Sequence, residues 1–188
     1  VHVENGTGNV TLPVLPAGNY TVNVTGEIPN YGSVNEPGED LIIGNGTIDV
    51  KLDISPVVYP SNVTAVIEAN VTGQYIVTVD GMDPVVVNVD KDTPYVLDLG
   101  VLPVGNYAVS VVSNITNYNR AEDSKTATVN NGTIDVNVTV IPADYPGNAT
   151  IVVNATVDGD YNVTVGNETY PVHVENGTGN VTLPVLPA

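Results

Sequence analysis

The motif Asn-x-Thr recurs along the whole chain and is the residue pattern with the clearest chemical meaning. In secreted proteins it is the acceptor of N-linked glycans. Placing the 23 Asn and the 26 Ser and Thr residues at random in 188 positions would give roughly three acceptor motifs. The sequence has sixteen, at Asn5, Asn9, Asn19, Asn23, Asn45, Asn62, Asn70, Asn114, Asn131, Asn137, Asn148, Asn154, Asn162, Asn167, Asn176 and Asn180. We therefore expect several of them to carry glycans.

A purely structural explanation accounts for the Thr of this motif and leaves the Asn unexplained. Thr is common on the solvent face of strands, whereas Asn is depleted there. In a strand, residues two apart project from the same face, so each motif presents both side chains together. Four of the motifs contain Asn-Gly, a turn dipeptide, and are the easiest to explain as structure alone: Asn5, Asn45, Asn131 and Asn176.

The remaining polar residues indicate no catalytic or metal site. Acidic residues cluster at 36–40, 90–92, 122–123 and 158–160, but none of these clusters has the spacing of an EF-hand loop, and we expect solvated loop charge rather than calcium. His2 and His173 occupy the same position of a repeat, and the chain has no Cys. One His per repeat cannot build a metal cluster, and we expect these residues on strand surfaces. We predict no catalytic residues, no metal and no cofactor, and therefore no enzyme.

The elements that carry these motifs come in repeats. Residues 1–17 and 172–188 are identical, VHVENGTGNVTLPVLPA, at an offset of 171 residues. We expect the chain to be a segment of a longer tandem array with this period. A weaker repeat of about 85 residues lies inside it: NGTIDV at 45–50 returns at 131–136, and LPAGNYTVNV at 15–24 returns as LPVGNYAVSV at 102–111.

These repeats predict the domain organisation. Residues 1–58 form the rear part of repeat type 1, residues 59–144 a complete repeat type 2, and residues 145–188 the front part of type 1, which overlaps 1–17 in sequence. Proline-containing segments at 55–60 and 141–146 are the expected joints, because proline stiffens a connection.

The composition indicates an all-β fold. Hydrophobic residues make up 42% of the chain, with no Phe, Trp or Cys, and the many Val and Ile residues favour strands. Alternation of apolar and polar residues predicts strands near 63–70, 74–80, 84–90, 94–99, 105–113, 125–130 and 133–141. In the last of these, Ile134, Val136, Val138 and Val140 share a face that should be buried. Seven strands in about 85 residues predict tandem immunoglobulin-like β-sandwiches; a transthyretin-like or carboxypeptidase-regulatory sandwich is the alternative.

Two further residue types fit this prediction. Tyr20, Tyr75, Tyr107 and Tyr161 recur in both repeat types, and we expect them in the core or at sandwich corners, with hydroxyls bonded to backbone. Asp80-Gly81, Asn45-Gly46 and Asn131-Gly132 are predicted turns.

The motif LPVGNYAV at 102–109, followed by Asn117-Tyr118, resembles the group-3 bacterial immunoglobulin-like repeat, and Leu15 to Val22 with Asn30-Tyr31 resembles it in the other repeat type. The Val-, Asn- and Thr-rich texture is similar to that of adhesin-like surface proteins of methanogenic archaea. The resemblance implies extracellular, structural or adhesive roles at the cell surface and brings no catalytic residues.

The net negative charge of the chain argues against partners that are themselves anionic. Four Lys and Arg face 21 Asp and Glu, a net charge of −17, which repels nucleic acid and anionic lipid. No apolar run is long enough to insert into a membrane. Residues 1–58 alone would leave one side of a sandwich core open, so we expect an adjoining copy, in the same polypeptide or in a neighbouring subunit, to complete it head to tail.

The expected function is that of an extracellular structural protein that forms a cell-surface fibre, stalk or sheath. The alternative is an adhesin whose repeats bind a host or partner-cell glycan or protein. Loops without aromatic or convergent polar groups favour the structural role.

Overall fold

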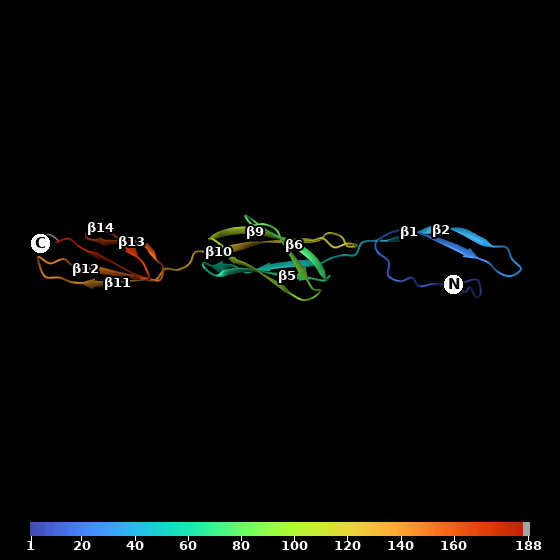
Figure 1. The fold of residues 1–188 in the computed structure, drawn as a ribbon, viewed down its shortest axis with the longest axis horizontal. Coiled ribbons are helices and arrows are strands. Elements are labelled where there is room, and N and C mark those ends of the chain that lie inside the picture. Colours follow the sequence, from blue (N-terminus) through green and yellow to red (C-terminus); the bar gives the residue numbers. More distant parts are fainter. Residues whose placement is uncertain (186–188) are drawn as a thin grey trace. The chain divides into compact units, whose positions relative to one another are not determined.

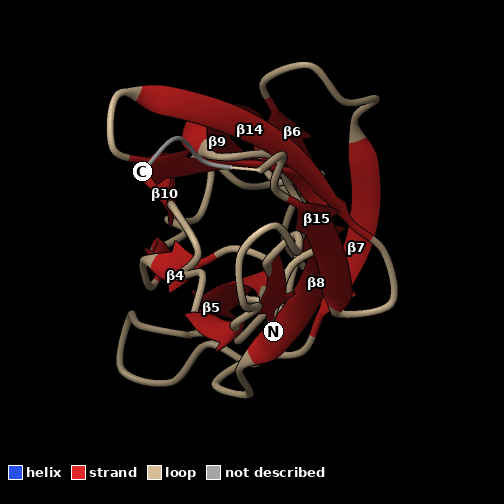
Figure 2. Ribbon diagram, turned by 90° about the vertical axis from the view of Figure 1, so that its left-hand side faces the viewer, coloured by secondary structure: helices blue, strands red, loops and turns tan. Residues whose placement is uncertain are grey.

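A computed structural model describes residues 1–185 and is all-β, as predicted. Among these residues there are fifteen strands and no helix (Figure 2), and hence no helix that could span a membrane. The strands are β1 (Gly18–Gly26), β2 (Val34–Ile43), β3 (Val50–Ile54), β4 (Val57–Val58), β5 (Asn62–Ala69), β6 (Gly73–Val79), β7 (Val85–Val89), β8 (Tyr95–Val101), β9 (Gly105–Ser113), β10 (Glu122–Asn130), β11 (Val136–Ile141), β12 (Thr150–Ala155), β13 (Gly159–Val165), β14 (Glu168–Val174) and β15 (Thr178–Thr182). Residues 186–188, the end of the predicted segment 145–188, lie outside the described residues.

The chain divides into two compact units, Val1–Asn131 and Gly132–Ala188. The main part of the first unit has two sheets, one in the order β3-β5-β8 and one in the order β4-β10-β9-β6-β7. Residues of both sheets form one hydrophobic core, in which Leu52, Ile67, Tyr75, Val109 and Val111 are completely buried. The buried positions alternate along each strand, which is the pattern of a sheet with one face in a core.

The predicted bonds between the hydroxyls of the four tyrosines and the backbone are confirmed. Each hydroxyl donates to the carbonyl oxygen four residues earlier: Tyr20 to Pro16, Tyr75 to Val71 and Tyr107 to Pro103, each at 2.8 Å, and Tyr161 to Val157 at 2.6 Å. Because donor and acceptor are close in sequence, this bond forms in both repeat types. Only Tyr75 is fully buried, and this burial raises the pKa of its hydroxyl.

Strands β1 and β2 form an antiparallel hairpin (Figure 1) that pairs with nothing else in the described chain. The pairing register shifts between Val22 and Val24, opposite Pro37 and Gly38. A β-carbon on Gly38 would lie 1.1 Å from the Val22 carbonyl oxygen, so this bulge accepts only glycine. Nearly every side chain of the hairpin is exposed.

The second unit contains a sheet in the order β11-β12-β15 and a hairpin of β13 and β14. Its core is small and consists of Ile151, Val153, Ala155, Val172, Val174 and Leu183, with Tyr161, Val163 and Val165 partly buried against it.

The strand pairing differs from the predicted domain boundaries at 58/59 and 144/145. Strand β3 pairs with β5, and β11 pairs with β12, so each strand joins the repeat that follows it. The proline segments predicted as joints therefore lie inside the two units, and residues 57–58 form β4, an edge strand that pairs with β10. A repeat period defines the length of a unit but leaves open where the unit starts.

Two local predictions also need correction. Asn45-Gly46 and Asn131-Gly132 form no turn; Gly46 instead makes a parallel bridge with Tyr118. The predicted turn at Asp80-Gly81 is confirmed, with Gly81 at φ +77°. The apolar face of 134–140 is not buried, because Ile134, Val136, Val138 and Val140 are 48–58% exposed.

Candidate assembly surfaces and glycan acceptor sites

The same fourteen residues occur twice, at 1–14 and at 172–185, and adopt two different states. In the second copy Val174 and Leu183 are 0% and 3% exposed, whereas their counterparts Val3 and Leu12 are 60% and 50% exposed. The second copy pairs with β13 and β12, and the first copy has no strand partner within residues 1–185. Burial of this segment therefore depends on neighbouring strands and not on its own sequence.

The tight turn inside this segment is nevertheless the same in both copies. Asn5 and Gly6 have φ of +50° and +83°, and Asn176 and Gly177 have +51° and +80°. These are the positive angles of a type I′ hairpin turn, for which Asn-Gly is the preferred pair. The turn is encoded locally and is present before its strands find partners.

Strand β1 is the counterpart of β9 in the other repeat type, but its apolar side chains are exposed where those of β9 are buried. Both begin with Gly-Asn-Tyr, and both tyrosines make the corner hydrogen bond. Val111 of β9 is 0% exposed, but its counterpart Val24 of β1 is 59% exposed. In the core of the first unit β9 pairs with β6, whereas β1 pairs only with β2 as far as the chain is described. One edge and one apolar face of β1 are open.

Strand β13 is the counterpart of β6 and is open on the complementary side. The core-facing residues of β6, Tyr75, Val77 and Val79, are buried, while Tyr161, Val163 and Val165 of β13 are only half-buried. The edge of β6 that holds β9 corresponds to an edge of β13 with no partner in residues 1–185. In the same way Leu52 of β3 is 0% exposed and Val138 of β11 is 51% exposed.

The structure places fourteen of the sixteen acceptor asparagines on the surface; Asn70 and Asn154 are half-buried. Four lie on the outward side of the sheet β11-β12-β15 or at its ends, at Asn137, Asn154, Asn176 and Asn180. The outward side of the sheet β3-β5-β8 is different, because it carries Lys51, Asp53, Glu68 and Asp98 together with the acceptors Asn62 and, at the end of β5, Asn70. The two repeat types thus present different outer surfaces.

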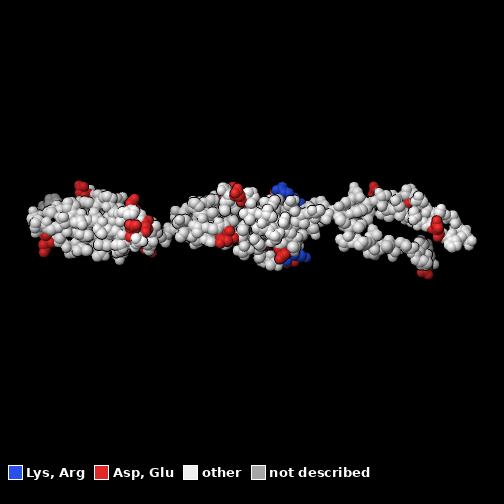
Figure 3. All heavy atoms as spheres, viewed as in Figure 1, with Lys and Arg blue, Asp and Glu red and all other residues white. Residues whose placement is uncertain are grey.

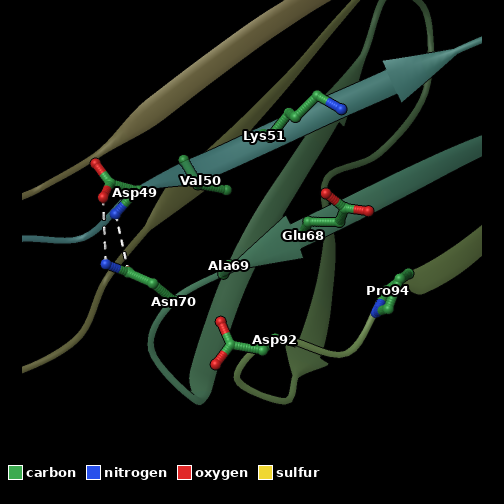
Figure 4. A pocket seen from close by; sticks show the side chains of 8 residues that line it. All are labelled: Asp49, Val50, Lys51, Glu68, Ala69, Asn70, Asp92 and Pro94. Atoms are coloured by element: carbon green, nitrogen blue, oxygen red, sulfur yellow. Dashed lines mark hydrogen bonds between the residues drawn. The ribbon is translucent and has the colours of Figure 1, made fainter.

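Some acceptor side chains are already engaged. In the hollow shown in Figure 4, Asn70 accepts the Asp49 backbone N–H at 2.9 Å and donates its amide to the Asp49 carboxylate at 3.4 Å. The Asn62 amide likewise donates to Asp98 at 2.9 Å. These bonds give Asn70 and Asn62 structural contacts whether or not they are glycosylated.

The polar groups that line the same hollow do not converge. The Lys51 amine pairs with Asp53 rather than with the lining residues Glu68 or Asp92. No acid–base pair or nucleophile is assembled there among the residues described. The hollow offers a wet surface and no catalytic arrangement.

The acidic residues that the sequence singled out have structural partners. The Asp158 carboxylate accepts the backbone N–H groups of Asn176 and Gly177 at 2.9 and 2.8 Å, which fixes the β14–β15 turn. The Leu52 N–H donates to Asp123 at 2.8 Å, and this bond lowers the pKa of that carboxyl. Nothing in the sequence pattern indicated either bond, because each joins residues of different strands.

The His173 ring nitrogen Nδ1 lies 2.7 Å from the Asp160 carboxylate on the neighbouring strand, and this contact raises the pKa of His173. Both side chains are mostly exposed, so the pair stabilises the fold little. Across the described residues no three His, Cys, Asp or Glu side chains are grouped as metal ligands. On the face shown in Figure 3 the acidic groups are scattered.

No protein-family model and no curated protein matches this sequence.

Proposed function

We propose that this protein is an extracellular structural protein whose tandem repeats form a fibre, stalk or sheath at the cell surface. Its incomplete segments are completed head to tail by an adjoining copy. The partner is therefore the same repeat, and the protein carries no catalytic site or cofactor. The net charge of −17 keeps such an assembly soluble and away from nucleic acid.

Each repeat is an immunoglobulin-like sandwich in this proposal. The sheet orders β3-β5-β8 and β4-β10-β9-β6-β7 support it, because the chain crosses between the two sheets after β3, β4, β5, β7 and β8 and both sheets share one core. The corner hydrogen bonds of the tyrosines support it as well. In this proposal each repeat starts at the strand that follows Asn45 or Asn131, which the pairing of β3 with β5 and of β11 with β12 supports.

One observation carries the proposal: equivalent residues are buried in one repeat and exposed in the other. Val111 and Leu52 are fully buried, and their counterparts Val24 and Val138 are 59% and 51% exposed. Apolar strands with free edges are sites of pairing with another chain, and proteins otherwise protect them with charge, proline or cover. Here the matching strands exist in every copy.

Electron microscopy of native cell surfaces, with gold-labelled antibody against residues 59–144, tests this function. A structural assembly gives label along continuous, ordered filaments or a sheath. Label restricted to short flexible strings that end in a different globular body would contradict the structural role and support the alternative, an adhesin in which these repeats are spacers or binding modules.

We also expect several asparagines to be glycosylated in native material. Exposed acceptors with free amides, such as Asn137 and Asn180, should carry glycan, and Asn70 should not, because its amide is bonded to Asp49. Glycopeptide mass spectrometry measures the occupancy of each site. Thr139→Ala should abolish the modification of Asn137, while Thr139→Ser should retain it. Unmodified asparagine at every acceptor, or modification of Asn70 alone, would refute this expectation.

A further inference from the structure

We infer that β1 of one copy pairs antiparallel with the free edge of β13 of the adjoining copy, in one defined register. The register places Val24 opposite Val163 and Val22 opposite Val165. The inference rests on the proposed completion by an adjoining copy and specifies which strands meet and how. It follows from the intact core of the first unit, in which both equivalents are present and paired.

A tyrosine hydrogen bond within each repeat fixes the residue at which each of the two strands starts. The Tyr20 hydroxyl binds the Pro16 carbonyl as Tyr107 binds Pro103, so β1 and β9 start at equivalent residues. The Tyr161 hydroxyl binds the Val157 carbonyl as Tyr75 binds Val71, which aligns β13 with β6. Contacts internal to each strand's own repeat therefore set the alignment, independently of any partner.

The register follows from the observed pairing of β6 with β9. In that pair Ile76 lies opposite Val112, Val77 opposite Val111, and Val79 opposite Val109. Transferred to the equivalent strands, these pairs become Asn162 with Thr25, Val163 with Val24, and Val165 with Val22. A slip of one residue would turn the valines of one strand to solvent. A slip of two residues would keep both apolar faces buried, and the observed pairing of β6 with β9 selects between these registers.

The second strand of the hairpin fits the same arrangement. Pairing with β1 places Leu41 and Ile43 of β2 where Ala127 and Val129 of β10 stand. These larger residues face the smaller Val138 and Val140 of β11, which stand where β3 has Leu52 and Ile54. A large residue on one strand is thus matched by a small one on the other, as a core at native density requires.

The Asn-Tyr turn gives a third point of fit. Tyr118 lies against Gly46, where a β-carbon would come within 2.6 Å of the ring. Asn117 and Asn30 share a left-handed backbone, with φ of +69° and +70°. Tyr31, the counterpart of Tyr118, is largely exposed, and Gly132, the counterpart of Gly46, has no ring upon it in the described structure. In the completed repeat Tyr31 of one copy covers Gly132 of the next.

Paired cysteines test the register, because the chain has no natural Cys. Asn162→Cys with Thr25→Cys joins positions that face each other about 5 Å apart between Cα atoms and point away from the core. The matched control, Thr164→Cys with Thr25→Cys, shares that face but is displaced by two residues, about 8 Å between Cα atoms, beyond the reach of a disulfide. Under mild oxidation the first pair should cross-link at least about tenfold faster.

Each cysteine pair is made in the present chain and in a chain extended by a second copy of residues 18–58. The two proteins distinguish an adjoining copy in a neighbouring subunit from one in the same polypeptide. In the present chain a cross-link joins separate subunits and gives a ladder of multimers. In a chain in which residues 18–58 are repeated after Ala188, with the second Thr25 mutated instead of the first, the cross-link closes within one polypeptide. Rapid cross-linking of the first pair in either protein supports the inference and shows which source applies.

Two results would overturn it. Faster cross-linking of the displaced pair would refute the register and leave completion by an adjoining copy standing. No cross-link from either pair in either protein, together with sedimentation as a monomer, would refute both the register and the proposed assembly.

Discussion

Replacing Val174 by Asp is expected to unfold the strands of the second unit, whereas the same change at Val3 should leave the protein unaltered. The two residues have the same neighbours in sequence for the whole length of the repeated segment. Val174 is completely buried among Val153, Val172 and Leu183, and Val3 is 60% exposed. A carboxylate without a partner in such a core costs at least about 3 kcal/mol. A core of six buried residues cannot absorb that cost.

Hydrogen exchange read by mass spectrometry measures this contrast. Peptides from 148–170 should lose their protection in Val174→Asp, and peptides from 62–79 in the same molecules provide the internal control. Peptides from the repeated segment are avoided, because its two copies have the same mass. Retained protection of 148–170 in Val174→Asp, or its loss in Val3→Asp, would show that the two copies do not differ in burial.

This contrast marks the limit of prediction from sequence for this fold. The strands from 62 to 113 lie within about two residues of their predicted positions, because alternation reports on each strand by itself. The tyrosine corners and the Asn5-Gly6 turn were also predictable, since their partners are at most four residues away. Local signals predict local structure in both copies of the repeat.

Partners distant in sequence were not predictable. Alternation shows that β11 has an apolar face but says nothing about what covers it, so this face was expected to be buried and is open. For the same reason the sequence grouped β11 with the strands before it, although it pairs with β12, which follows it. Asn45-Gly46 reads as a turn, yet the Gly46 N–H donates to the Asn117 carbonyl and Gly46 bridges to Tyr118, about 70 residues later in the chain.

The acceptor asparagines show the same difference between local signals and partners distant in sequence. Their motif is evident in the sequence, but whether an amide is free depends on the strand beside it. Asn70 meets Asp49 across 21 residues and Asn62 meets Asp98 across 36. The motif identifies the asparagines that could be acceptors, and the strand pairing shows which of their amides are already hydrogen-bonded.

Val24→Asp is expected to abolish association of copies while leaving the core of the first unit intact. Val24 is 59% exposed in the chain, so a carboxylate there stays in water and costs the single chain little. In the completed repeat the same position is equivalent to Val111, which is fully buried. Association would then bury an unpaired charge at a cost of at least about 3 kcal/mol, a loss of about a hundredfold or more in affinity.

Val111→Asp is the matched control, with the same substitution at the equivalent position of the other repeat type. It should unfold the core of the first unit in single chains at any concentration, whereas Val24→Asp should change only the concentration dependence. Sedimentation velocity over a range of protein concentrations gives the association constant, and thermal unfolding gives the stability of the core. Because both variants add one negative charge, a general electrostatic effect would weaken association equally in both. Unchanged association of Val24→Asp would mean that this face of β1 remains in water in the assembled protein, and the exposed valines of the hairpin would then need a different explanation.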